Sequence, residues 1–468
     1  MYHISDIKQF SSCPKKYFLN KNSNKTYFNF FRNEYNIVDI YKSVFNIDEC
    51  FIGQTGDNPS LVFDYIDKYE YFINARFATS NLRVKASLLH KESEGFSLYF
   101  FKPMLPKELD VVSIYITYDI LKRNKINITN IYLISVDREY VLDDQIDFNK
   151  ALIITDKFND ISILETIENY SFDYDSIINS IENYKSNDDN KLEKYCSTCE
   201  YFNECFNDLL TDDSIMHLVS SKYKYDMYLD GKKYLKDTDL SRIDGTSLQY
   251  AQIMSNKNNG LFIDKPRLKE FMNSFKSDVI SFIDFEWDCF LFPIYKKMNC
   301  FGLLPFEFSL YIKNGNELTN YNFVGKGDCR KEFIETLINS LPDKGPIVAY
   351  NSFSAEVLRI EELATQFPEY KEKLKNIAKR FIDIAEVFSK GMIYDIRFKG
   401  QLSLKNIDSV ISNISYKELD VKDGLEAVLN FRRYESNNDD NIKDALIKYC
   451  NQDAYSLVLI YEYLLKLI

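Results

Sequence analysis

Long apolar runs and histidines are scarce in this sequence of 468 residues. No stretch of about 18 or more apolar residues occurs, so the sequence predicts no membrane span. The first residues lack the basic and then apolar segments of a signal peptide, and we expect a cytoplasmic protein. The histidines His3, His90 and His217 have no partner at a ligand spacing. We therefore assign them no metal-binding or general-base role.

A glycine-rich phosphate loop and an excess of positive charge are also missing. No Gly-Lys-Ser/Thr motif of the Walker type is present, which argues against a nucleotide cofactor. The formal net charge is −12, so the chain as a whole does not attract nucleic acid. Any contact with a phosphate backbone must then rest on local basic patches.

The remaining composition is that of a globular protein with more than one domain. Apolar residues make up 45% of the chain and charged residues 27%, which is enough to form full cores under a polar surface. A chain of this length is expected to form two or three domains. We expect a first domain at 1–210, a helical connector at 211–275 and a second domain at 276–468. In the last region, strand-like segments followed by alternating strands and helices predict a mixed α/β sheet.

Three of the nine cysteines lie close together in YCSTCEYFNEC. Cys196, Cys199 and Cys205 are separated by two and by five residues and are flanked by aromatic residues. This spacing indicates a metal site. Cys13, in SSCPKKYF, is the best candidate for a fourth ligand. An iron–sulfur cluster, a structural zinc ion and free thiols all remain open, and spacing alone does not separate the first two.

Two carboxylates alternate in the strand-like segment SFIDFEWDC. Asp284 and Glu286 project from the same face of a strand, because successive side chains of a strand alternate. Two adjacent carboxylates repel each other unless a cation neutralises them, so the pair indicates a divalent metal. On a late helix, Tyr449 and Asp453 are spaced i, i+4 and share one face. Between these motifs, Glu356 stands at the start of a predicted helix that follows a buried strand.

The first domain resembles the iron–sulfur PD-(D/E)XK nucleases, which include nucleases of CRISPR adaptation. The resemblance rests on a Cys-Pro near the N-terminus and three cysteines after the last helix of the domain. It implies that Cys13, Cys196, Cys199 and Cys205 hold a 4Fe-4S cluster, with zinc as the alternative. The same resemblance places the catalytic residues of the family at Ser87, Phe100, Lys102 and Thr117.

Of these four positions only Lys102 keeps the residue type of the family, which has Asp at position 87 and Glu at position 100. Serine and phenylalanine do not hold Mg²⁺, which prefers oxygen ligands and usually carboxylates. Asp110 and Asp119 are the nearest substitutes, but neither stands in the frame of the family motif. We therefore expect a nuclease-like domain that has lost catalysis.

The acidic motifs of the second domain resemble the DEDD pattern of 3′→5′ exonucleases with a ribonuclease H-like fold. By that resemblance two Mg²⁺ or Mn²⁺ ions are bound by four carboxylates, and Tyr449 orients the attacking water. The implied metal ligands are Asp284, Glu286, Glu356 and Asp453. Asp383, in FIDIAEV, is a candidate second-layer acid or a capping residue, and Ser403 is a candidate helix cap.

A longer series of motifs resembles a bacterial family of unknown function, the "domain of unknown function 2779" family. The motifs are DFEW, LLPFEFSLYI, AYN, GQLSLKNI, SYKELDVKDGLEAV and KYCNQDAYSLV. In this family an iron–sulfur nuclease-like domain is fused to a DEDD exonuclease-like domain. The sequence departs from the pattern at Trp287, where a small Thr is usual, and by one extra residue before Glu356.

These resemblances imply a metal-dependent 3′→5′ exonuclease acting on single-stranded DNA or RNA. The nuclease-like domain would serve as a binding platform. The alternative is a non-catalytic scaffold that binds nucleic acid or a partner. The sequence does not choose between DNA and RNA, and it indicates no particular protein partner.

Overall fold

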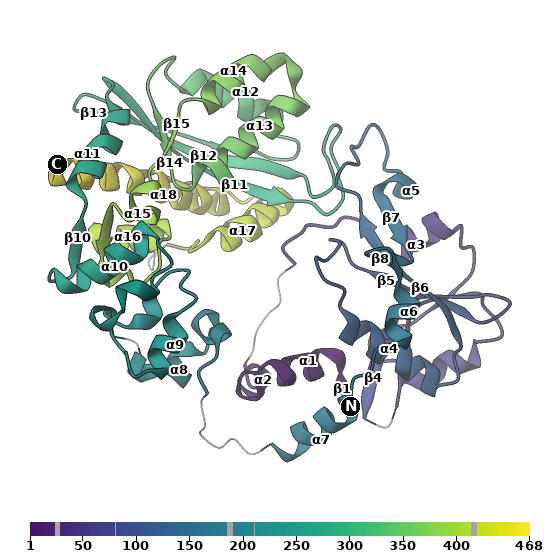
Figure 1. The fold of residues 1–468 in the computed structure, drawn as a ribbon. Helices are drawn as coiled ribbons and strands as arrows, with labels where there is room; N and C mark the ends of the chain where they lie inside the picture. The colour runs from purple at the N-terminus through teal and green to yellow at the C-terminus, as the bar shows by residue number, and fades with distance from the viewer. Residues whose placement is uncertain (24–28, 80, 185–190, 210, 413–418) are drawn as a thin grey trace. The chain divides into compact units, whose positions relative to one another are not determined.

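The chain forms two compact units in the computed structural model, which describes residues 1–23, 29–79, 81–184, 191–209, 211–412 and 419–468 (Figure 1). Unit 1 comprises Met1–Asp189 and Cys289–Gly302, and unit 2 comprises Asn190–Asp288 and Leu303–Ile468. Both units combine helices with β-sheets. The expected mixed α/β class is therefore confirmed.

The division between the units differs from the expected domain boundaries. It falls at Asp189 and not near residue 210, which itself lies outside the described residues. The cysteine segment consequently belongs to unit 2. The expected connector at 211–275 also belongs to unit 2, because its strand Leu261–Ile263 pairs with Ile393–Asp395. Conversely, the segment Cys289–Gly302 belongs to unit 1 although the residues on either side of it belong to unit 2, and its Leu291 and Phe292 are part of a hydrophobic core of unit 1.

Unit 1 begins with a short strand and two helices, Ile4–Ser12 and Pro14–Lys21. They are separated at Cys13, which caps the second helix, and Pro14 follows at a position where a missing N–H costs nothing. The elements of unit 1 are β1 (Tyr2–His3), α1 (Ile4–Ser12), α2 (Pro14–Lys21), α3 (Ile37–Phe45), β2 (Phe51–Ile52), β3 (Tyr71–Ala78), β4 (Leu82–Lys91), β5 (Phe96–Phe101), α4 (Val111–Arg123), β6 (Ile128–Val136), α5 (Phe148–Ala151), β7 (Leu152–Thr155), β8 (Lys157–Phe158), β9 (Ile161–Ser162), α6 (Ile163–Glu168) and α7 (Tyr174–Asn183).

The main sheet of unit 1 has the order β2-β3-β4-β5-β6-β7, with β1 paired to β4. Strands β3, β4 and β5 are antiparallel neighbours, whereas β6 runs parallel to β5. A parallel pair needs a crossover connection, and α4 supplies it. Helices α1, α4, α6 and α7 contribute buried residues to the same hydrophobic core as the sheet.

Unit 2 contains the longest helix of the described chain, α18 (Asp440–Leu467). Its other elements are α8 (Phe202–Cys205), α9 (Lys224–Leu229), α10 (Ser247–Lys257), β10 (Leu261–Ile263), α11 (Lys265–Met272), β11 (Val279–Cys289), β12 (Leu303–Asn314), β13 (Glu317–Val324), α12 (Arg330–Ser340), β14 (Ile347–Ala349), α13 (Glu356–Gln366), α14 (Lys371–Ala378), β15 (Phe381–Asp383), α15 (Glu386–Ser389), β16 (Ile393–Asp395), α16 (Leu404–Ile411) and α17 (Gly424–Asn437).

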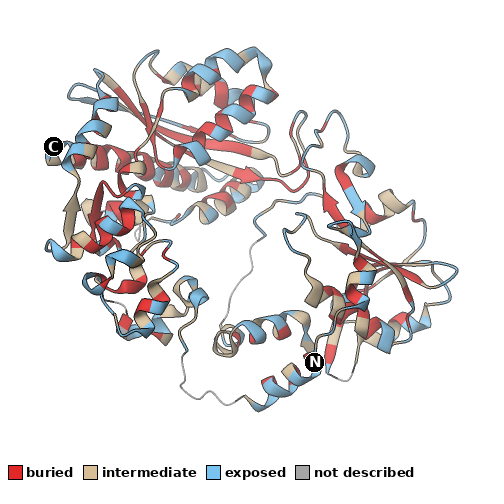
Figure 2. Ribbon diagram, in the orientation of Figure 1, coloured by how far each residue is buried: buried red, intermediate tan, exposed pale blue. Residues whose placement is uncertain are grey.

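The five-stranded sheet of unit 2 has the order β13-β12-β11-β14-β15. Strands β11, β14 and β15 are parallel, so their carboxyl ends meet at one edge of the sheet. On one face, Phe333 of α12 packs edge-on against Phe285 and Phe308. On the other face, Tyr461 of α18 packs against Phe282. The central strands are accordingly buried on both sides, as Figure 2 shows in red.

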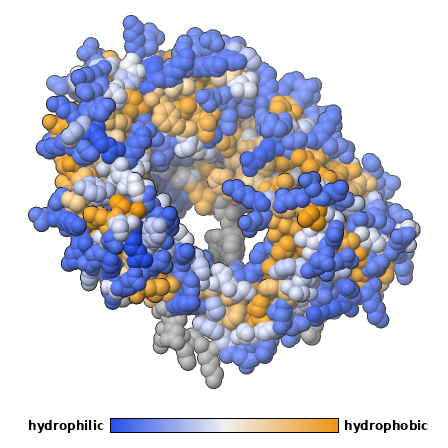
Figure 3. Space-filling model, viewed as in Figure 1, coloured by the Kyte–Doolittle hydropathy of each residue, from blue (hydrophilic) through white to orange (hydrophobic). Residues whose placement is uncertain are grey.

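Polar and apolar residues divide between surface and interior. Hydrophilic side chains cover much of the face visible in Figure 3, with smaller apolar patches between them. Within the described ranges, no helix is both long enough and apolar enough to cross a membrane. This finding includes α18, which carries charged residues along its length.

Candidate metal centre

Three carboxylates from β11 and α18 converge in unit 2. Oxygen atoms of Asp284, Glu286 and Asp453 all lie within 4.8 Å of one another. Asp284 and Glu286 are half-buried on one face of β11, and Asp453 is buried on the helix that packs on that face. The structure thus brings together two sequence motifs that are more than 150 residues apart.

The electrostatics of this cluster are unfavourable without a cation. The pKa of Glu286 is raised to about 8, mainly by burial and then by the charges of Asp453 and Glu356, while Lys405 acts in the opposite direction. The pKa of Asp284 is also well above its ordinary value, first because of burial and then because of the neighbouring carboxylates. A group of acids held this close in a buried place is stabilised when a divalent cation binds.

Glu356 lies at the first position of α13, as the sequence predicts, and borders the cluster without belonging to the set of three. Its carboxylate accepts a hydrogen bond from the backbone of Phe285, the residue between Asp284 and Glu286. Burial is the main reason why its pKa rises to about 8. Its Oε2 atom is buried and has no hydrogen-bond partner among the residues described. An oxygen of this kind is available to a metal ion.

Tyr449 is buried one helical turn before Asp453 on α18. The phenol hydrogen-bonds to Asp453, and burial together with the nearby carboxylates raises its pKa far above the usual value. The ammonium nitrogen of Lys405 lies 4.5 Å from the centre of the Tyr449 ring. The phenol therefore stays protonated and is held between a cation and the acid cluster.

Two further residues of the site were missed from the sequence. Glu307 of β12 is fully buried, and neither of its carboxylate oxygens has a partner within the described part of the chain. Burial raises its pKa well above the usual range, and the charges of Glu286 and Asp453 add to this effect. Cys450 donates its thiol to Asp284, with Sγ 3.5 Å from Oδ2. An acid inside the otherwise apolar strand FEFSLYI was the available signal for Glu307.

Two candidate residues of the sequence have structural roles. Asp383 accepts hydrogen bonds from the backbone N–H groups of Asn351 (2.8 Å) and Ala385 (3.0 Å), so it fixes the loops after β14 and β15. Ser403 caps α16 by accepting from the N–H of Asn406 at 3.4 Å. Both contacts are those of capping residues.

Residues 281–403 match the family model DUF2779, whose description is a domain of unknown function. No curated protein and no solved structure gives a significant match to the chain. The DUF2779 match includes Asp284, Glu286 and Glu356, while Tyr449 and Asp453 follow it in sequence.

Trp287, the residue that directly follows Glu286, is half-buried. The guanidinium carbon of Arg359 lies 5.1 Å from the centre of its indole ring. Arg359 comes from α13, the helix that Glu356 begins. The two residues therefore tie the start of α13 to the end of β11 beside the carboxylates.

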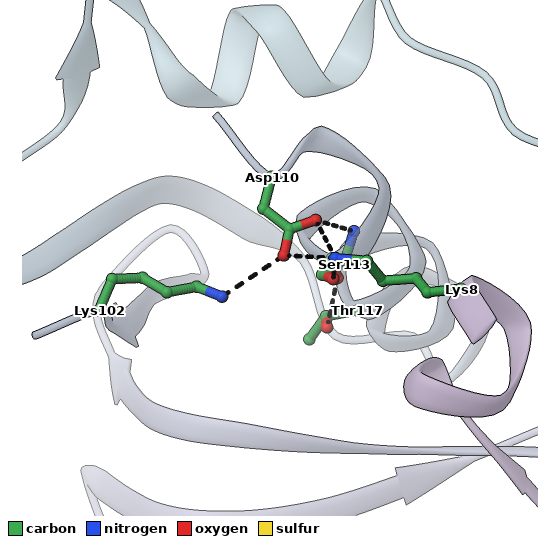
Figure 4. A network of polar contacts seen from close by, with 5 residues as sticks. All are labelled: Lys8, Lys102, Asp110, Ser113 and Thr117. Atoms are coloured by element: carbon green, nitrogen blue, oxygen red, sulfur yellow. Dashed lines mark hydrogen bonds and ion pairs between the residues drawn. The ribbon is translucent and has the colours of Figure 1, made fainter. Parts of the chain in front are cut away.

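The corresponding positions of unit 1 contain no such acid cluster. Phe100 is buried in the hydrophobic core, and the hydroxyl of Thr117 donates to the backbone oxygen of Ser113. Lys102 lies 3.5 Å from Asp110, which also accepts two hydrogen bonds of 2.9 Å from Lys8 (Figure 4). Partial burial raises the pKa of Asp110, but the hydrogen bonds of Lys8 and Ser113 outweigh it and the net pKa is lowered. Asp110 is thus an ion-paired helix cap.

The four cysteines expected to share a cluster are divided between the units. Cys13 belongs to unit 1 and caps α2, whereas Cys196, Cys199 and Cys205 belong to unit 2. In the described ranges, the one group of at least three ligand atoms within 4.8 Å contains no cysteine. A tetrahedral zinc site with bonds of about 2.3 Å would hold its thiolates about 3.8 Å apart. The cofactor of these cysteines stays a prediction.

Proposed function

We propose that unit 2 is a metal-dependent 3′→5′ exonuclease that acts on single-stranded nucleic acid. The observation that carries the proposal is the set of carboxylate oxygens of Asp284, Glu286 and Asp453 within 4.8 Å of one another. Glu356 borders this set and Tyr449 is hydrogen-bonded to it. These are the five residues that the DEDD resemblance assigns to catalysis.

The donor set fits hard divalent cations. Mg²⁺ and Mn²⁺ prefer carboxylate oxygens, and among the described residues Oε2 of Glu356 and both carboxylate oxygens of Glu307 are buried without a hydrogen-bond partner. Asp284, Glu286, Glu356 and Asp453 would hold the ions. When bound, such ions activate water and stabilise the charge that develops during phosphodiester hydrolysis.

The chain's own residues then position the reactants. Tyr449, protonated and donating its O–H to Asp453, can accept a hydrogen bond from an attacking water and so orient it. Lys405 offers a positive charge beside the same ring, where a phosphate oxygen of the substrate would be favoured. The Cys450 thiol and the backbone of Phe285 hold Asp284 and Glu356 in place.

The substrate class is supported by aromatic residues next to the catalytic motifs in the chain. Phe353, three residues before Glu356, is 53% exposed. Trp287 follows Glu286 directly and is half-buried. Exposed aromatic rings bind unpaired bases by stacking and tolerate different sequences. Single-stranded nucleic acid is the substrate that uses them.

The sheet order is consistent with a ribonuclease H-like domain, in which a first strand carries the leading acids in the middle of the sheet. Here Asp284 and Glu286 lie on β11 in the middle of the sheet, Glu356 comes after β14, and α18 packs on the face that carries the two leading acids. Unit 1, with its helix, three antiparallel strands, crossover helix and parallel strand, is consistent with a PD-(D/E)XK-like platform.

The exonuclease is tested on the full chain with single strands labelled at the 3′ or the 5′ end, as DNA and as RNA, in Mn²⁺. We expect the 3′ label to be released first as mononucleotide and the 5′ label to remain on shortening products. Asp284→Ala should abolish both signals. Asp278→Asn, an exposed acid just before β11, is the matched control. Equal activity, or equal inactivity, of wild type and Asp284→Ala on every strand would refute the proposal.

The second candidate function is a non-catalytic scaffold. It is favoured for unit 1, where Ser87 and Phe100 stand at the positions that are acidic in the nuclease family. The same assay separates the two candidates, because a scaffold binds the labelled strands without shortening them. The cysteine cofactor needs its own measurement. Protein purified without oxygen should show a broad visible absorbance that Cys199→Ala removes if iron and sulfide are bound. Zinc released without such absorbance would replace the iron–sulfur proposal.

A further inference from the structure

Unit 1 contains a pocket of about 480 Å³ whose lining is rich in positive charge. It lies at β1, β3, β4 and the turn after β2. The lining residues are His3, Thr55, Gly56, Arg76, Arg83, Val84 and Lys85. The pocket uses none of the residues that the resemblance to nucleases points to.

The cations of this pocket face one another across paired strands. Arg76 of β3 stands directly opposite Lys85 of β4, and His3 of β1 stands opposite Arg83 of β4. Like charges at directly opposed positions destabilise a sheet. The sheet nevertheless places Arg76 and Lys85 opposite each other at one pocket, with Arg83 beside them, which favours an anionic ligand that compensates the repulsion.

The positive charge is not balanced by the protein. Within the described part of the chain, Arg76 and Lys85 form no ion pair and no side-chain hydrogen bond. Arg83 donates to the backbone oxygen of Asp57 at 2.7 Å, and the Asp57 carboxylate in turn accepts from the N–H of Gln54. Asp57 is the one carboxylate that acts on Arg76. Three cations against one carboxylate leave the pocket with an excess of positive charge.

The pKa values of Arg76 and Lys85 agree with an excess of positive charge in the pocket. Partial burial lowers the pKa of Arg76, and the charge of Arg83 lowers it further. Partial burial also lowers the pKa of Lys85, and Arg76 adds to the effect. A bound anion would relieve both the desolvation and the repulsion.

We infer that this pocket binds a phosphate group with two negative charges, either at the end of a nucleic-acid strand or as a free phosphoanion. A terminal phosphate matches the excess of charge better than an internal phosphodiester, which carries a single charge. Arginine guanidinium groups suit phosphate oxygens because they donate two parallel hydrogen bonds. The site is independent of the carboxylates of unit 2, so it stands or falls separately from the exonuclease.

Binding of inorganic phosphate to the full chain is measured by calorimetry in EDTA, against chloride at equal ionic strength. We expect saturable binding with one site, at least about 10-fold weaker in Arg76→Gln and in Lys85→Gln, because each charge-assisted contact to phosphate is strong. Lys157→Gln removes an exposed lysine of unit 1 outside the pocket and should bind like wild type. Equal affinity in all four proteins would overturn the inference.

The two sources of the phosphate are distinguished with one oligonucleotide carrying either a 5′-phosphate, a 3′-phosphate or only hydroxyl ends. Tighter binding of one phosphorylated form, abolished by Arg76→Gln, assigns the pocket to that strand end. Binding of inorganic phosphate without any preference among the three strands assigns it to a free phosphoanion. No binding of phosphate and no preference among the strands would overturn the site.

The thermal stability of the variants in phosphate-free buffer tests whether Arg76 and Lys85 have a purely structural role. If the cations only supported the fold, Arg76→Gln would lower the melting temperature. If they are held for a ligand, removing one of two opposed charges should leave it unchanged or raise it. A clear fall of the melting temperature together with unchanged phosphate binding would contradict the inference.

Discussion

The central strands of the two units carry opposite charges. In unit 1, β3 and β4 present Arg76, Arg83 and Lys85 at one pocket, and the one acid near Lys102 is ion-paired. In unit 2, β11 presents Asp284 and Glu286 beside Glu307 and Glu356, two buried acids with oxygens that have no hydrogen-bond partner among the described residues. Both arrangements cost stability in the isolated chain. The difference indicates what each unit is built to receive, an anion in unit 1 and divalent cations in unit 2.

The largest effect is expected from Asp284→Asn. Since this residue would ligate metal, we expect exonuclease activity to fall by at least about 10³-fold. The metal-free protein should at the same time become more stable, because one of several mutually repelling carboxylates is gone. Activity on a 3′-labelled strand and melting temperature in EDTA measure the two effects. A fall in both would mean that Asp284 supports the fold.

A glutamate at position 100, where the nuclease family has one, should destabilise unit 1 and should not create a metal site. Phe100→Glu places a carboxylate in the hydrophobic core, and we expect a loss of about 3–5 kcal/mol in the free energy of unfolding. Phe100→Leu, which keeps the site apolar, should cost less. Urea unfolding of both variants measures the difference. A stable Phe100→Glu protein that binds Mn²⁺ in unit 1 would contradict the conclusion that only unit 2 is suited to bind divalent cations.

The stability of the metal-free protein should fall as the pH rises. Glu286 and Glu356 have pKa values of about 8 in the folded chain, above their ordinary value. Between about pH 4.5 and 8 the folded state therefore holds protons that the unfolded state has released, and the stability decreases across this window. Mg²⁺ replaces those protons, so its stabilising effect should grow with pH. Melting temperatures in EDTA and in Mg²⁺ at both ends of the window test this.

A smaller effect is expected at Lys405. Its charge lowers the pKa of Glu286, so Lys405→Met should raise that pKa and move the acidic limb of the activity profile to higher pH. We expect activity to fall about 10-fold near neutral pH and to recover in part at high pH. An equal loss at every pH would assign Lys405 to substrate binding alone.

The smallest effect is expected from Asp110→Asn in unit 1. Asparagine keeps the helix cap, and ion pairs that are partly exposed contribute little, so the cost should be about 0–1 kcal/mol. Exonuclease activity should not change. A loss of activity as large as that of Asp284→Asn would place a catalytic acid in unit 1 and reverse the comparison.

Much of the candidate site could be predicted from local pattern. Asp284 and Glu286 were placed on a strand, Glu356 at a helix start, and Tyr449 with Asp453 on one helical face, because strand alternation and helical periodicity are local properties. Glu307 was missed because a strand buried on both faces shows no alternation that would mark an acid as part of a site. The pocket of Arg76 and Lys85 was missed because it depends on the register between two strands.

The sequence by itself determined the mixed α/β class and the order of the acidic motifs. Only the tertiary structure decided which residues of distant segments meet. It separated Cys13 from Cys196, Cys199 and Cys205 into different units, assigned 211–275 to unit 2, and set the like charges of unit 1 opposite each other. The physical reason is that periodicity fixes the face of an element, whereas burial and strand register, which follow from the packing of the whole unit, fix its neighbours.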